Sequence, residues 1–252
     1  MFIPKPEYPY PSKKIIIFSG AGLDAPSGIR TFRDANGLWN EHKIEDVCTE
    51  RTWKKNFELV HNFYNERRKE LKDVEPNYAH KVITEIINKY GKENVYNITM
   101  NVSDMFERLN TEVLHVHGEL IKMECSHCYH NWNIDYNSFD ITKDRCPECS
   151  SLKSVRPKIV FFGGPAPLYS YLNRAFSHAI NKDSIVIVIG TQGNVVDVED
   201  LLLGTKCKKI LCNMEESEDI DVDLIKFNEV YYENIETSID KVFQFIKNNW
   251  EV

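Results

Sequence analysis

The 252-residue chain has an ordinary globular composition, with 42% hydrophobic and 27% charged residues, and a net charge of −7. An acidic balance argues against a nucleic-acid partner, because binding to phosphates needs clustered Lys and Arg. No apolar run approaches the roughly 20 residues that span a bilayer, and residues 1–12 lack the pattern of a secretory signal. We therefore expect a cytoplasmic protein with no membrane partner. The sequence is silent on its oligomeric state.

Short apolar runs predict buried strands, and helical segments lie between them. The expected strands are 13–19, 94–99, 184–189 and 209–212, and the expected helices lie near 78–90 and 170–182. Strands that alternate with helices are typical of a parallel, doubly wound sheet. The sequence thus predicts an α/β, Rossmann-like fold.

Two insertions are expected to form a smaller lobe on one side of this sheet. The first is 35–75, in which 52–72 is rich in Glu, Lys, Arg and aromatic residues and predicts a long helix. The second is 119–156. The remaining segments would make the nucleotide-binding domain: 1–34, 76–118 and 157–252.

A glycine turn, Gly20-Ala21-Gly22, directly follows the first predicted strand. Glycines there let the backbone approach a pyrophosphate, and the amides of a following helix start favour negative charge. The dinucleotide fingerprint GxGxxG is not completed, because Ala25 occupies its last position. The turn alone does not distinguish a phosphate site from an ordinary strand-to-helix turn.

Four of the seven cysteines form two close pairs, Cys125-x2-Cys128 and Cys146-x2-Cys149. Two such knuckles can close tetrahedrally on one Zn²⁺ as four thiolates, and a site with four protein ligands has no open position for catalysis. The alternative, four buried free thiols, does not explain the doubled spacing. We expect a structural zinc ion.

Two polar residues follow apolar stretches that would end at the ligand edge of the sheet. Asn101 comes after the strand ending at Thr99, and His117 comes after the apolar stretch 113–116. The carboxyl ends of parallel strands face the ligand crevice of such folds. A single histidine is, however, more often a hydrogen-bonded core residue, so the position alone does not assign a role.

Taken together, these segments resemble the sirtuin family of NAD-dependent protein deacylases over nearly the whole chain. The matching motifs keep the family's order: GAG, SGI and TFR within 20–33, GLW at 37–39, PN-x-AH at 76–80, TMNVSD at 99–104, HVHGEL at 115–120, both cysteine pairs, RPKIVFFGG at 156–164, IGTQGNV at 189–195 and CNMEES at 212–217.

The resemblance implies NAD as co-substrate, an acylated lysine peptide or protein as partner, and nicotinamide and O-acyl-ADP-ribose as products. His117 would be the general base on a ribose hydroxyl, and Asn101 would position that ribose. General base catalysis of this kind typically contributes about 10²-fold to 10⁴-fold in rate. Phe32 and Arg33 would lie on a loop that closes over the dinucleotide. Phe162, Gly163 and Gly164 would offer backbone to an extended peptide by strand addition.

The resemblance also assigns the dinucleotide pocket. Gly190 and Thr191 would hold phosphate through their backbone amides, and Asn213 would contact the adenosine ribose. The whole expected set is Gly20, Ala21, Gly22, Asp24, Phe32, Arg33, Trp39, Met100, Asn101, Ser103, Gly190, Thr191, Gln192 and Asn213.

A finer match concerns the acyl group. Tyr64 and Arg67 stand three residues apart on the predicted helix, hence on one face, and resemble the branch that removes succinyl, malonyl or glutaryl groups. A guanidinium and a phenol together can hold a carboxylate. Cys48 falls where that branch has a small alanine, which leaves room for the acyl chain. The alternative is that Tyr64 packs inward and Arg67 is solvated.

Several residues depart from the family pattern. Ser103 stands where the family has an aspartate that accepts a hydrogen bond from the nicotinamide amide. Asp24 stands where the family has a serine, and there it would cap a helix start yet repel a pyrophosphate. Met100 replaces a glutamine, and Gln192 replaces a serine. Two alternatives therefore stay open: an NAD hydrolase or ADP-ribosyltransferase, and a catalytically impaired nucleotide-binding module.

Overall fold

The computed structural model describes residues 13–30 and 43–250. The residues assigned to the closing loop, Phe32 and Arg33, and the cofactor candidate Trp39 lie outside these ranges.

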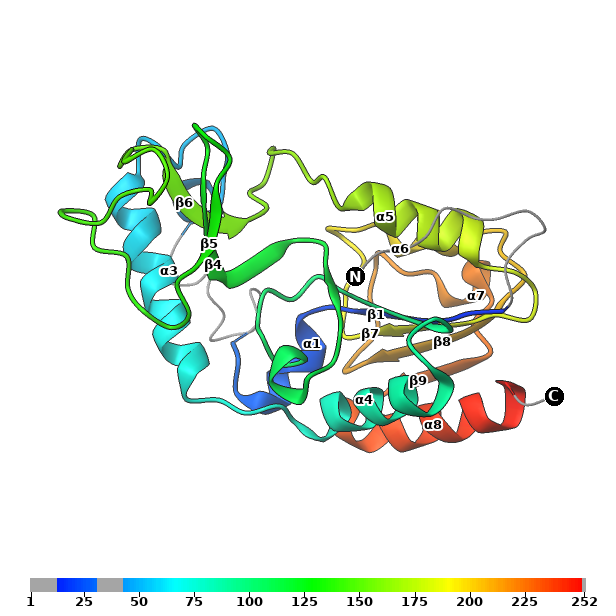
Figure 1. Cartoon of the computed structure of the whole chain (residues 1–252). Coiled ribbons are helices and arrows are strands. Elements are labelled where there is room, and N and C mark those ends of the chain that lie inside the picture. Colours follow the sequence, from blue (N-terminus) through cyan, green and yellow to red (C-terminus); the bar gives the residue numbers. More distant parts are fainter. Residues whose placement is uncertain (1–12, 31–42, 251–252) are drawn as a thin grey trace.

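A six-stranded parallel sheet organises the larger part of the molecule (Figure 1). The strand order is β3-β2-β1-β7-β8-β9, and every neighbouring pair is parallel. The bounds are Ile15–Ser19 for β1, Val95–Thr99 for β2, Leu114–His115 for β3, Ile185–Ile189 for β7, Lys208–Asn213 for β8 and Glu229–Tyr232 for β9. From β1 the chain adds strands in one direction, and from β7 it adds them in the other. The topological switch point, where such folds bind ligands, therefore lies between the carboxyl ends of β1 and β7.

Helices cover both faces of this sheet, as Figure 1 shows. On one face lie α4 (Tyr78–Tyr90) and α8 (Ile235–Trp250), and on the other lie α5 (Tyr169–Arg174), the π-helical turn η4 (Ala175–Ala179), α6 (Val198–Leu202) and α7 (Val222–Ile225). The predicted doubly wound sheet is confirmed.

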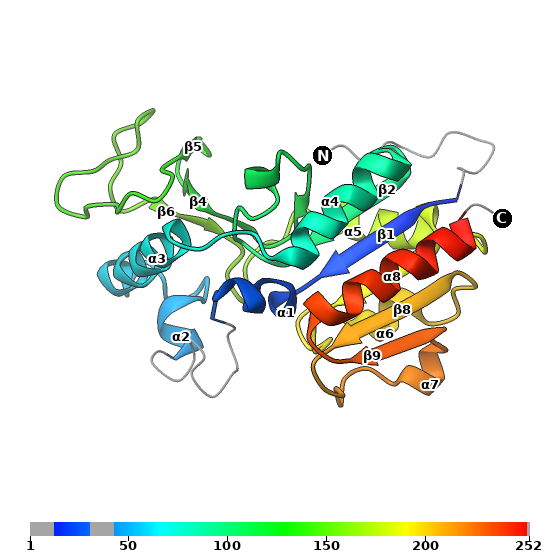
Figure 2. The same cartoon turned by 90° about the horizontal axis from the view of Figure 1, so that it is seen from below.

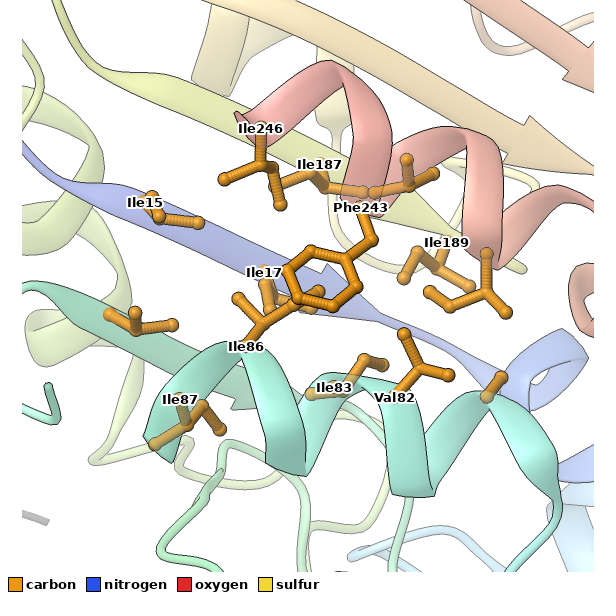
Figure 3. Close-up of a cluster of buried hydrophobic side chains, with 14 of the residues drawn as sticks. Ile15, Ile17, Val82, Ile83, Ile86, Ile87, Ile187, Ile189, Phe243 and Ile246 are labelled. Carbon is orange, nitrogen blue, oxygen red and sulfur yellow. The ribbon is translucent and has the colours of Figure 1, made fainter. Parts of the chain in front are cut away.

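The central strands read as continuous apolar runs because both their faces are buried. Ile15 and Ile17 of β1 pack with α4 and α8, while Ile16 and Phe18 pack on the opposite side. Figure 3 shows the first of these clusters, in which Phe243 of α8 lies over Ile17. Each such buried side chain contributes roughly 1.5–3 kcal/mol. The sheet is thus a rigid base for the loops at its carboxyl edge.

A second, antiparallel sheet belongs to the smaller part, at the left of Figure 1. Its order is β5-β4-β6, with β4 at Gly118–Cys125, β5 at Asn131–Asn133 and β6 at Val155–Ile159. The helices α2 (Ile44–Val47) and α3 (Phe57–Lys72) share one hydrophobic cluster with this sheet. The structure agrees with an appended lobe, and the domain boundaries remain a proposal.

Three local predictions need correction. The helix expected from residue 52 begins at Phe57, because residues 51–56 form turns. The helix expected over 170–182 is regular only to Arg174 and then widens into η4. The helix after the glycine turn, α1 (Ala21–Asp24), has one turn only and leads into the 3-10 turn η1 (Ala25–Ser27), where Pro26 stands. Among the described residues no helix is long and apolar enough to cross a membrane.

Candidate active site and metal centre

Two glycine turns meet backbone to backbone at the switch point. The Gly22 amide donates to the Gly190 carbonyl at 2.9 Å. A Cβ on Gly190 would lie 2.5 Å from the Cα of Gly22, and Gly190 has a φ of +61°. A side chain at either position would push the turns apart. The sequence explained these glycines by the approach of a pyrophosphate, and the structure adds that the turns after β1 and β7 require them to pack together.

The loop after β7 is held by the end of β8. The Thr191 amide donates to Oδ1 of Asn213 at 3.0 Å, and Nδ2 of Asn213 donates to the Thr191 carbonyl at 2.8 Å. The Gly190 amide donates to the Cys212 carbonyl at 2.8 Å, so both amides that were expected to bind phosphate already have a partner within the chain. Gln192 comes next and is half-buried, and its carbonyl accepts from Ser217 Oγ at 2.6 Å. Asn213 therefore fixes the shape of this loop.

Asn101 is fixed by hydrogen bonds to three segments. Its Nδ2 donates to the Gly20 carbonyl at 2.9 Å, its amide donates to Thr99 Oγ1 at 3.0 Å, and its carbonyl is 2.6 Å from Nδ1 of the buried His115. The other ring nitrogen of His115 lies 2.9 Å from Glu107. Burial lowers the pKa of His115, but the Glu107 carboxylate outweighs it, so that the pKa is raised. Asn101 is thus tied to the first glycine turn.

His117 lies next to the same segment. Its ring hydrogen-bonds to the backbone of Met100, the residue before Asn101, and its Nε2 is 2.8 Å from the Tyr169 hydroxyl. Burial lowers the pKa of His117 below 6.5, and the bond to Met100 opposes this. The imidazole is therefore neutral near pH 7, as a general base must be. The structure brings Gly20, Met100, Asn101 and His117 together at the carboxyl edge of β1, β2 and β3.

Asp24 does not cap a helix. It is the last residue of α1, its side chain makes no capping hydrogen bond, and it is buried. Its carboxylate instead accepts from Ser103 Oγ at 2.6 Å and contacts His80 Nε2 at 3.1 Å. Two departures from the family pattern thus contact each other.

The candidate acyl-binding residues lie in the smaller part. Tyr64 is buried, and its ring stacks on Phe161 with centroids 5.9 Å apart. Its phenol hydrogen-bonds to the Cys48 thiol, and burial raises the pKa of both groups. Arg67 lies with Tyr64 on the buried side of α3 and holds both carboxylate oxygens of Glu70, at 2.9 and 3.0 Å. The alternative prediction that Arg67 is solvated is wrong, because only a tenth of its side chain is exposed.

The segment assigned to peptide binding already pairs with the chain itself. The Phe162 amide donates to the Cys48 carbonyl at 2.9 Å, and the Glu50 amide donates to the Phe162 carbonyl at 3.0 Å. Gly163 has a φ of +75° and nothing within 4 Å of a built Cβ, and Gly164 approaches Glu50. The exposed ring of Phe162 and the open flank of Gly163 leave space beside this bridge.

The four paired cysteines form a metal centre. Their sulfurs all lie within 4.8 Å of one another, with Cys125 to Cys149 and Cys128 to Cys146 at 3.6 Å. A tetrahedral zinc with Zn–S bonds of about 2.3 Å separates its sulfurs by about 3.8 Å. The donor set therefore fits structural zinc.

Both knuckles have the same backbone conformation. The residue after each pair, Tyr129 or Ser150, has a φ near +60° and donates its amide to the carbonyl of the first cysteine, Cys125 or Cys146. This repeated turn aims both sulfurs of a pair at one point, and it explains the spacing found in the sequence.

The sequence interpretation missed three residues that hold the site. His80 belongs to the PN-x-AH motif but had no role, His115 stands in HVHGEL beside the expected base, and Tyr169 begins α5 with no motif around it. Only His80 and His115 stand in sequence motifs that could have pointed to them.

A surface hollow of about 690 Å³ lies elsewhere, lined by residues such as Phe176, Leu201 and Lys206. It borders the loops before β7 and β8, at the amino ends of these strands. None of the candidate residues lines it.

A doubly wound sheet with polar residues gathered at its switch point, joined to a four-cysteine lobe, defines a nucleotide-binding α/β protein. Comparison with known proteins makes this specific. Residues 20–197 match the model of the Sir2 family. The chain belongs to the Sir2 family, the sirtuins.

Relatives and solved structures agree with this membership. An NAD-dependent protein deacylase of Campylobacter jejuni is 40% identical over 238 residues, covering 94% of this chain and 97% of that protein. One of Helicobacter hepaticus is 39% identical, covering 92% and 96%. The structure of a Sir2 homologue in complex with NAD has a TM-score of 0.77 and 27% identity, covering 94% of this chain and 90% of that one.

Proposed function

We propose that this chain removes acyl groups from protein lysines with NAD as co-substrate, releasing nicotinamide and O-acyl-ADP-ribose. NAD supplies an electrophilic ribose carbon with nicotinamide as its leaving group. The relatives named NAD-dependent protein deacylase and the Sir2 homologue bound to NAD support this function. The half-buried imidazole of His117, whose pKa is lowered by burial and which lies next to the segment that holds Asn101, is the structural observation that carries it.

The residues at the switch point have distinct roles in this proposal. The Met100 backbone accepts from the His117 ring and leaves Nε2 to take the proton of a ribose hydroxyl, after Tyr169 gives up its contact with that nitrogen. Asn101, held against Gly20, positions the ribose. Gly20, Ala21, Gly190 and Thr191 line the dinucleotide crevice. The roles predicted for Phe32, Arg33 and Trp39 remain part of the proposal, since these residues lie outside the ranges that the structure describes.

The fit of a dinucleotide rests on backbone geometry. Gly22 and Gly190 contact each other backbone to backbone, and a Cβ on Gly20 would strike the Gly190 carbonyl at 2.7 Å. The two turns therefore carry no side chains where they meet, and a dinucleotide seated over them would contact backbone.

Mass analysis of the products tests the reaction. Wild-type protein incubated with NAD and an acylated peptide should yield deacylated peptide and O-acyl-ADP-ribose. His117→Ala should yield neither product while keeping the wild-type unfolding temperature. Free ADP-ribose without O-acyl-ADP-ribose would instead identify an NAD hydrolase, and no product with wild-type protein that still binds NAD would reduce the chain to a nucleotide-binding module.

We further propose a preference for short acidic acyl groups such as succinyl or malonyl. Tyr64 and Arg67 share the buried side of α3, and a guanidinium binds a carboxylate in the bidentate manner in which Arg67 now holds Glu70. A succinyl carboxylate must therefore displace or share Glu70, whereas an acetyl group has no such competitor.

The ratio of kcat/KM for succinyl-lysine to that for acetyl-lysine peptide tests this preference, because each protein is its own control. The ratio should exceed one in wild type, fall in Arg67→Gln and rise in Glu70→Gln, which removes the competing charge. Equal or reversed rates in wild type would refute the preference without affecting deacylation itself.

A further inference from the structure

A buried polar cluster lies between the first glycine turn and the proposed ribose-binding segment. It consists of Asp24 at the end of α1, Ser103 in the loop after β2 and His80 at the start of α4. These residues are 4%, 7% and 0% exposed. Figure 2 shows the start of α4 beside α1. Three segments far apart in the sequence thus meet at one carboxylate.

Asp24 is the acceptor in both hydrogen bonds of the cluster. A carboxylate only accepts, so Ser103 Oγ donates to Asp24 Oδ2 at 2.6 Å and His80 Nε2 donates to Oδ1 at 3.1 Å. The two oxygens offer about four acceptor positions, and side chains of the described residues occupy two of them. In addition, His80 Nδ1 is buried and has no hydrogen-bond partner among the described residues. Buried polar groups are normally satisfied, so the remaining lone pairs of Asp24 and the Nδ1 atom of His80 can accept a further hydrogen-bond donor.

The cluster adjoins the residues that are proposed to bind the ribose of NAD. Ser103 is two residues after Asn101, whose amide holds the Gly20 carbonyl, and Asp24 is four residues after Gly20. Asn77 also ties this region together, since its Nδ2 donates to the Leu23 carbonyl at 2.7 Å. The nicotinamide half of NAD carries a carboxamide donor and a positively charged ring, which a carboxylate beside the proposed ribose site would complement.

The identities of the two contacting residues are reversed relative to the sirtuin pattern. That pattern has a serine after the GAG turn and an aspartate two residues after the asparagine, whereas this chain has Asp24 and Ser103. Because the two side chains hydrogen-bond to each other, the exchange keeps one carboxylate and one hydroxyl at the same point. A single exchange would leave two carboxylates or none. The two departures are therefore one compensated change.

We propose that Asp24 is the residue that accepts the nicotinamide carboxamide of NAD in this chain, with Ser103 and His80 positioning its carboxylate. This inference rests on the proposed use of NAD. It assigns the nicotinamide contact to α1 instead of to the loop after β2, and it gives Ser103 a positioning role where the sirtuin pattern has the aspartate.

Calorimetric titration with NAD and with ADP-ribose, which lacks nicotinamide, tests the assignment without relying on catalysis. Asp24→Ser should weaken NAD binding about 10-fold to 100-fold, the amount that a hydrogen bond to a charged group typically contributes, and leave ADP-ribose binding unchanged. Ser103→Asp should weaken NAD binding through two facing carboxylates. The double variant Asp24→Ser/Ser103→Asp should bind NAD within about 3-fold of wild type, since coupled neighbours are not additive.

Two results would overturn the assignment: equal losses for NAD and ADP-ribose in Asp24→Ser, or a double variant as weak as the weaker single variant. If Asp24→Ser unfolds, Asp24→Asn keeps the size of the side chain and should show the same selective loss of NAD binding. Failure of deacylation with this selectivity intact would refute the proposed function alone. Deacylation without the selectivity would refute the role of Asp24 alone.

Discussion

His61 makes the stability of the smaller part depend on pH. Its ring is fully buried in α3, stacks on Phe139 at 4.5 Å and lies 3.1 Å from the Val155 carbonyl of β6 through Nε2. Burial lowers its pKa from 6.5 to about 4, the Val155 carbonyl opposes this, and the nearby Arg68 and Lys153 charges add to it. The folded protein therefore holds this imidazole neutral.

The sign and size of the effect follow from this pKa. Between pH 6.5 and 4, His61 is protonated in the unfolded chain but stays neutral in the folded protein. The free energy of unfolding therefore falls as the pH falls through this window. Lowering the pKa of His61 by about 2.5 corresponds to at most about 3 kcal/mol in the free energy of unfolding, and about 2 kcal/mol of this is lost by pH 5. For a protein of this size that lowers the unfolding temperature by about 4–8 °C.

Scanning fluorimetry of the zinc-loaded protein at pH 7.5 and pH 5.0 measures this loss, with His61→Gln as the matched control. Glutamine keeps a donor near Val155 but does not titrate. Acid effects on the zinc thiolates are common to both proteins and cancel in the comparison. Wild type should lose about 4–8 °C more than the variant. Parallel losses in the two proteins would refute the buried neutral imidazole.

Three further predictions follow from the site. Gly190→Ala should lower the unfolding temperature far more than Gly204→Ala, because both have positive φ but only Gly190 has Gly22 2.5 Å from a new Cβ; equal losses would show that the contact between the turns does not matter. Cys146→Ser or a strong chelator should unfold the smaller part, as circular dichroism would report; full activity after zinc removal would contradict a structural ion. The pH profile of kcat/KM should have an acidic limb below 6.5, set by the lowered pKa of His117, and a limb at or above 6.5 would contradict the burial of this base.

The sequence predicted what depends on local pattern. The strand Ile15–Ser19 is apolar on both faces, and each cysteine pair closes a turn within its own six residues, so both could be recognised without neighbours. The glycines of the turns were found, but not the packing of Gly22 against Gly190, which joins residues 168 positions apart.

Contacts between distant segments could not be predicted. Asp24 and Ser103 each read as a separate defect, because their hydrogen bond joins segments 79 residues apart. In the same way, no motif near Tyr169 indicates its contact with His117. The ion pair between Arg67 and Glu70 depends on side-chain rotamers, which the spacing of residues in the sequence does not determine. The sequence predicted the candidate residues, and the tertiary structure shows which of their polar groups already have partners within the chain.

In the proposed reaction, NAD is cleaved at this switch point only when an acyl-lysine accepts the ADP-ribosyl group. Nicotinamide and O-acyl-ADP-ribose should be counted in the same reaction, with and without acylated peptide. The two products should form in equal amounts with the peptide, and almost no nicotinamide should form without it. Nicotinamide released at the same rate in both reactions would show that NAD cleavage does not depend on the acyl-lysine.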